Sequence, residues 1–170
     1  MNALVIFPIT LMFLLITSFD HKKSDVALAT ITCDSIPVLN KQIIAFVNTN
    51  IGKTVGKGEC WDVAAEALNK VNARWDGNYK FGKEVNYKKD CVFPGDIMQF
   101  ENVVLKYSVG SKQFIEKMTH HTAIIYDVKG KEELVMADQN TGRSGKKVGL
   151  SPLNFKDMTK GSFKIFRPMN

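Results

Sequence analysis

A cysteine at the start of an expected helix is the residue of this chain best placed for covalent chemistry. Cys60 follows a loop made flexible by Gly56 and Gly58, and the residues after it have the spacing of an amphipathic helix. Unpaired N–H groups and the positive end of the helix dipole favour a thiolate there, and they could also hold an oxyanion. The alternative is a small buried cysteine that opens an ordinary helix.

Two adjacent histidines could supply the base that a catalytic thiol needs. His120 and His121 stand at the head of a strand expected from Thr122 to Val128. Because strand side chains alternate between faces, only one of the pair can point toward the Cys60 helix. A surface histidine at a strand edge is the competing interpretation.

A third group could orient the imidazole. In the strand expected from Leu134 to Gln139, alternation places Asp138 and Asn140 on one face and Gln139 on the other. An acceptor on that face could hold an imidazole N–H and fix its tautomer. A hairpin connection at residues 128–131 would bring this strand beside the histidine strand, so the three segments are predicted to form one site.

The elements that must position these groups indicate an α+β fold. A helical pattern follows Pro37, a second helix begins at Cys60, and residues 72–90 have the composition of an irregular surface segment. Short strands are expected at residues 97–100, 122–128, 134–139 and 162–167. Helices followed by strands without alternation predict an antiparallel sheet packed on the Cys60 helix.

The N-terminal residues are typical of a targeting segment. Residues 1–19 are almost continuously apolar, which predicts a signal peptide or, alternatively, an N-terminal membrane anchor. Residues 20–36 read as a polar linker, and residues 37–170 as one hydrolase domain. The expected location is therefore secreted, periplasmic or at the cell surface, with anchoring to a membrane as the alternative.

The charge of the chain bears on its partners. The formal net charge of +6 would attract an anionic surface, such as a cell-wall polymer or lipid headgroups. The lysines are scattered without a stripe interleaved with aromatic residues, so we predict no nucleic-acid partner. No cofactor is expected, and no metal site, because cysteine and histidine pairs at metal-ligand spacing are absent from the sequence.

Three cysteines make an odd count. In an oxidising compartment this suggests one reactive thiol and one bridge, which would join Cys33 to Cys91 if Cys60 is the nucleophile. Two further free thiols remain the alternative.

Four motifs in order resemble a known superfamily. They are Gly58-Glu59-Cys60-Trp61-x-x-Ala64, Pro94-Gly95-Asp96-Ile97, His121-x-Ala123-Ile124-Ile125 and Asp138-Gln139-Asn140. Together they resemble the papain-like CHAP and NlpC-type cysteine amidohydrolases. They are also similar to the cysteine-proteinase-fold domain of a fungal actin-patch-associated protein.

The resemblance implies a papain-like fold and a hydrolase that cleaves amide or peptide bonds, with peptidoglycan as a substrate. Carried over by motif, it makes Cys60 the nucleophile, His121 the base, Asp138 the orienting acid and Asn140 a fourth member. Three features depart from the pattern. The acid position carries an aspartate with an amide two residues on, so either Asp138 or Asn140 could orient the imidazole. Glu59 would oppose thiolate formation if it pointed inward, and the loop before Cys60 has no side-chain oxyanion donor. A catalytically silent binding or scaffold domain of the same fold is therefore the alternative function.

Overall fold

Two helices come first in the computed structural model, which describes residues 1 and 33–170. Helix α1 (Val38–Asn50) begins directly after Pro37, and helix α2 (Cys60–Lys70) begins at the cysteine, as expected. Residues 2–19 of the predicted targeting segment and residues 20–32 of the predicted linker lie outside the described residues. Within the described part of the chain, no helix is long and apolar enough to cross a lipid bilayer.

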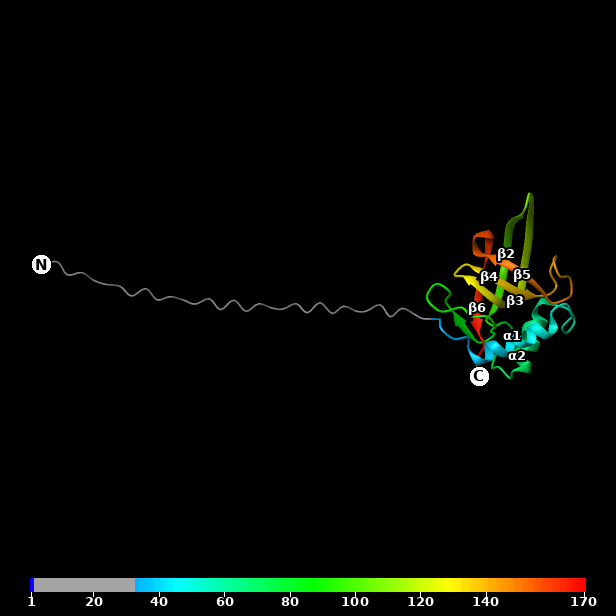
Figure 1. Cartoon of the computed structure of the whole chain (residues 1–170), viewed down its shortest axis with the longest axis horizontal. Helices are drawn as coiled ribbons and strands as arrows, with labels where there is room; N and C mark the ends of the chain where they lie inside the picture. Colours follow the sequence, from blue (N-terminus) through cyan, green and yellow to red (C-terminus); the bar gives the residue numbers. More distant parts are fainter. Residues whose placement is uncertain (2–32) are drawn as a thin grey trace. The chain divides into compact units, whose positions relative to one another are not determined.

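One antiparallel sheet follows the helices (Figure 1). Its strands are β1 (Lys83–Val85), β2 (Ile97–Val109), β3 (Lys112–Gly130), β4 (Glu133–Asp138), β5 (Gly149–Asn154) and β6 (Met158–Arg167). Their order in the sheet is β1-β6-β2-β3-β4-β5, and every pairing between neighbours is antiparallel. This arrangement confirms the α+β class with an antiparallel sheet.

Alternation along the strands divides the apolar side chains into two clusters. The first contains strand residues such as Ile97 and Ile124 together with the buried stripe of α2, which includes Ala64 and Leu68. The second is formed by strand residues whose side chains point to the other face of the sheet, such as Met98. Helix α2 packs mainly against β3, so the element that carries Cys60 lies beside the strand that carries the histidines.

The strands are longer than the sequence suggested. The segments expected at 97–100 and 122–128 are parts of β2 and β3, which pair in continuous register from Ile97 opposite Ile124 to Val109 opposite Lys112. The resulting hairpin extends beyond the rest of the sheet (Figure 1). Its outer half is rich in exposed charged and polar residues, which hides the strand pattern. The histidines consequently lie within β3 rather than at its head, and the connection to β4 falls at 131–132.

A buried carboxylate joins the ends of the domain. Asp96 is fully buried, and its Oδ1 accepts hydrogen bonds from Asn40 Nδ2 at 2.8 Å and from Arg167 Nε at 3.1 Å. Its Oδ2 accepts from Arg167 Nη2 at 2.7 Å and from the Phe93 N–H at 2.9 Å. One side chain therefore connects α1, the turn before β2 and the end of β6.

Asp96→Asn is expected to lower the free energy of unfolding by about 2 kcal/mol, because it removes the negative partner of the largely buried Arg167 guanidinium. The measurement is urea unfolding. The matched control is Glu84→Gln, which breaks the exposed 3.0 Å ion pair with Lys164 and should cost less than about 0.5 kcal/mol. Equal effects of the two changes would contradict the role given to Asp96.

Candidate active site

The side chain of an aspartate in the first turn of α2 holds the loop before Cys60 by hydrogen bonds. Asp62 Oδ2 accepts hydrogen bonds from the backbone N–H of Lys57 at 2.8 Å and of Glu59 at 3.0 Å. Gly56 adopts φ +56°, and a Cβ added there would lie 2.8 Å from the Asp62 carboxyl group. Only glycine therefore fits this turn, and the turn fixes where Cys60 enters the helix.

A buried amide holds the same loop from the side of the sheet. Gln139 is fully buried, and its Oε1 accepts from Val55 N–H at 3.1 Å. Its Nε2 donates to the carbonyl groups of Val55 and Glu59, both at 2.8 Å. Gln139 directly follows Asp138, so it ties the cysteine loop to the strand that carries the acid. Sequence reasoning assigned Gln139 no role, although a polar residue in a buried strand next to the acid was a usable signal.

His121 and Asp138 form a buried pair. Their strands are aligned by the pairing of Ile124 with Ala137. The Nε2 atom of His121 lies 2.9 Å from Asp138 Oδ2, and the two residues are only 5% and 2% exposed. The carboxylate therefore holds one ring nitrogen and leaves the other, Nδ1, for another partner.

The Cys60 thiol is near enough to His121 for the two groups to shift each other's pKa. Burial alone would raise the pKa of Cys60, but hydrogen bonds from His121 and from the Thr122 and Trp61 N–H groups, with the positive charge of His121, lower it. Burial would likewise lower the pKa of His121, but Asp138 and Cys60 together raise it to about 9. The opposite shifts favour a thiolate beside an imidazolium.

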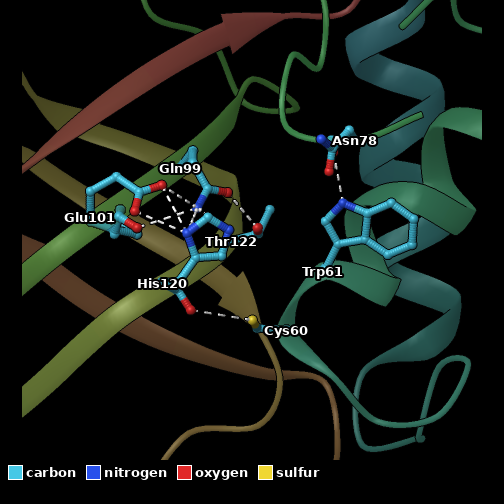
Figure 2. A network of polar contacts seen from close by, with 8 residues as sticks. Cys60, Trp61, Asn78, Gln99, Glu101, His120 and Thr122 are labelled. Carbon is cyan, nitrogen blue, oxygen red and sulfur yellow. Dashed lines mark hydrogen bonds and ion pairs between the residues drawn. The ribbon is translucent and has the colours of Figure 1, made fainter. Parts of the chain in front are cut away.

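The neighbouring His120 points to a different polar cluster (Figure 2). Its Nδ1 lies 2.9 Å from the Glu101 carboxylate, and the Gln99 amide approaches the same ring. Only the backbone of His120 approaches the cysteine, with its carbonyl oxygen 4.0 Å from Cys60 Sγ. Of the two histidines, His121 is therefore the one whose side chain meets Cys60.

The structure corrects the position expected for Asn140. Strand β4 ends at Asp138, and Asn140 adopts φ +63°, so the alternation that would have placed it beside Asp138 no longer applies. Its Nδ2 donates to Glu59 Oε2 at 2.8 Å instead of meeting the imidazole. Glu59 also pairs with Lys146 at 3.0 Å, so its carboxylate is engaged at the surface.

A groove of about 480 Å³ opens at this site. It lies between the outer half of β3, from Ile115 to His121, and the turn at residues 140–142, with Cys60 among its lining residues. A substrate in this groove would therefore reach the thiol.

The other two cysteines form the disulfide that was expected. Cys33 and Cys91 are bonded, with 5.7 Å between their Cα atoms. Cys60 is the free cysteine of the three. Across residues 33–170, no group of three or more histidine, cysteine, aspartate or glutamate side chains is arranged to hold a metal ion.

Comparisons with known proteins agree on a fold family. The family model of the AIM3/BBC1 cysteine proteinase-fold domain matches residues 38–170. A curated relative, altered inheritance of mitochondria protein 3 of Debaryomyces hansenii, is 26% identical over 145 residues. The match covers 75% of this chain but only 15% of that protein.

Solved structures of one protein are also similar. A crystal structure of Ly7917 aligns with a TM-score of 0.44 at 17% identity, covering 75% of this chain and 62% of that one. A structure of Ly7917 with the hydrolyzing product of MDP aligns with a TM-score of 0.46 at 15% identity, covering 76% and 62%.

Proposed function

This chain belongs to the AIM3/BBC1 cysteine proteinase-fold family, and on that premise we propose that it is a cysteine hydrolase that cleaves amide or peptide bonds. The observation that carries the proposal is the meeting of Cys60, His121 and Asp138 at one end of an open groove. Two parts of the proposal rest on the sequence alone: export, on the apolar residues 1–19, and a peptidoglycan substrate, on the family resemblance.

The proposed reaction follows from the ion pair. The Cys60 thiolate attacks the substrate carbonyl, forming a C–S bond and an oxyanion near the Cys60 N–H. When the C–N bond breaks, His121 gives its proton to the leaving amine. His121 then takes a proton from water, the hydroxide attacks the thioester, and the C–S bond breaks to release the acid and restore the thiolate.

The position of Glu59 supports this chemistry. An acid beside the nucleophile would repel a thiolate if it pointed inward. Here the Glu59 carboxylate is held by Lys146 and Asn140 at the surface instead. Asn140 is therefore proposed to act on the site indirectly, by holding Glu59.

A second candidate function is a catalytically silent binding or scaffold domain. It is favoured by the loop from Lys53 to Glu59, in which two polar side chains bond to groups other than a substrate oxyanion. Lys53 donates to Thr49 O at 2.7 Å, and Glu59 pairs with Lys146. The backbone would then be the main source of oxyanion donors. The chain also spans only about 15% of the curated relative's length, so the activity of such a longer protein would be a separate proposal.

The rate of alkylation by iodoacetamide between pH 5 and 10 tests the first function. Because the pKa of Cys60 is lowered, we expect labelling to reach half its maximal rate well below pH 8.5, near which a free thiol titrates. The matched control is His121→Ala, which should move the profile back toward that of glutathione. A wild-type profile that coincides with glutathione would favour the silent domain.

A further inference from the structure

The groove at Cys60 continues along the projecting hairpin. A second hollow of about 380 Å³ shares Ile115, Glu116 and Gly142 with the first, and it reaches Phe114 and Arg143. Together the two hollows run from the thiol toward the tip of the β2–β3 hairpin. A ligand that fills both must be long and narrow.

One wall of this groove is a strand edge. Strand β3 pairs with β2 from Lys112 to Ile124 and with β4 from Ile124 to Gly130. The outer half, from Lys112 to Ala123, pairs with β2 alone among the described strands. Its second edge therefore presents backbone N–H and C=O groups to the groove.

The inner end of this edge faces Cys60. The carbonyl oxygen of His120 lies 4.0 Å from Cys60 Sγ (Figure 2), and the backbone N–H of Thr122 is among the groups that lower the pKa of the same thiol. The edge that β4 leaves unpaired is thus the edge that leads to the thiol. An unpaired edge is a template for an added strand, in which main-chain hydrogen bonds provide affinity.

Side chains along the outer half suit a peptide with apolar residues. Ile115 is 64% exposed and Phe114 is 40% exposed, which is unusual for large apolar residues. Phe114 stacks on Tyr107 with 5.4 Å between the ring centroids, so this apolar wall is ordered before a ligand binds. Charged side chains lie beside this wall: Glu116 lines both hollows and Lys117 lines the one at the thiol, while Arg143 donates to the Tyr107 hydroxyl at 3.1 Å.

We infer that an extended polypeptide segment adds as a short strand to the free edge of β3, with its side chains alternating between the face of Ile115 and the face of Phe114. The inference rests on the proposed function in one respect, because the added strand would present its next carbonyl group to Cys60. Six residues of β3, from Ile115 to His120, span about 20 Å, which matches a peptide of about six residues. The occupant is thus a linear peptide segment.

The test is fluorescence anisotropy with the full chain carrying Cys60→Ala, so that no probe is consumed. The probe is a fluorescein-labelled hexapeptide of alternating valine and threonine, and two derivatives carry N-methyl groups on alternate amides. In an added strand only every second N–H faces the edge. We expect one derivative to bind at least about tenfold more weakly, because several hydrogen bonds are lost, and the other to bind within about twofold of the parent.

A protein variant locates the binding. A Cβ added at Gly142 meets no atom within 4 Å, so Gly142→Phe should fold normally while its ring fills the groove. We expect it to weaken peptide binding at least tenfold. The matched control is Gly130→Phe at the far end of β3, where an added Cβ meets only Glu133 Cβ at 3.9 Å, and it should leave the affinity unchanged.

Several results would overturn the inference. They are no binding of the hexapeptide up to 1 mM, equal effects of the two N-methyl patterns, an unchanged affinity in Gly142→Phe, or binding of muramyl dipeptide alone. Because binding is measured without the thiol, failure of hydrolysis would leave this result intact. Conversely, wild-type turnover of a small nitrophenyl ester with no peptide binding would support the hydrolase and reject the strand site.

Discussion

Cys60→Ala is expected to reduce hydrolysis at least about 10³-fold, whatever amide substrate the wild type accepts, because no other described group can form the covalent intermediate. Cys60 is the free thiol, since Cys33 and Cys91 are bonded to each other. The remaining imidazole and groove can bind a substrate but cannot form the thioester. The measurement is turnover of a panel of muropeptides, linear peptides and nitrophenyl esters by both proteins.

The same substitution should leave the fold intact. Cys60 is only partly buried at the end of a helix, and alanine is a good helix residue. We expect the free energy of unfolding to change by less than about 1 kcal/mol, so a loss of turnover would report on chemistry. If no member of the panel shows turnover that depends on Cys60, the proposed hydrolase is wrong and the binding domain is favoured.

Asp138→Asn should lower kcat between about 10² and 10⁴-fold while leaving KM nearly unchanged. The Asp138 carboxylate accepts the hydrogen bond from His121 Nε2 at 2.9 Å and, after the opposing effect of burial, is the largest cause that raises the pKa of His121. An amide can present an N–H to that nitrogen and select the wrong tautomer. The imidazolium would also lose its buried negative partner.

The pH dependence distinguishes this role from a structural one. In the wild type, kcat/KM should fall as pH rises through about 9, because His121 then loses the proton that it donates. On the acid side it should fall as the Cys60 thiolate is protonated. In Asp138→Asn the pKa of His121 is lower, so the alkaline limb should move to lower pH.

Asp127→Asn is the control for the loss of one negative charge in Asp138→Asn. Asp127 lies on β3 and pairs with Lys129 at the surface, away from the groove residues. Its neutralisation should leave both the rate and the pH profile unchanged. An alkaline limb that stays near pH 9 in Asp138→Asn would show that Asp138 does not set the protonation of His121.

Local patterns in the sequence were enough for much of the fold. The apolar spacing after Pro37 and after Cys60 predicted both helices at the residues where they begin. The run from Thr122 to Val128 and the run from Leu134 to Gln139 predicted the pairing of β3 with β4. Patterns of this kind are legible because one face of each element is buried.

Other elements carried too little local signal. The outer hairpin, residues 101–119, is largely exposed apart from Val103, Leu105 and Met118, so few of its residues show the alternation of a buried face. β1 is three residues long, and β5 contains Pro152, which disfavours a strand assignment from sequence. These elements exist because neighbouring strands offer them hydrogen-bonding partners.

The sequence by itself determined the candidate nucleophile, the order of the motifs, and which residues could supply the thiol, the imidazole and the acid. The motif context of His121 already favoured it over His120, whereas only the tertiary structure decided that His120 turns to Glu101 and that Asn140 turns to Glu59. The reason is that backbone conformation sets the direction of a side chain. Asn140 has a left-handed backbone conformation just after the end of β4, so its side chain departs from the position that strand alternation predicted.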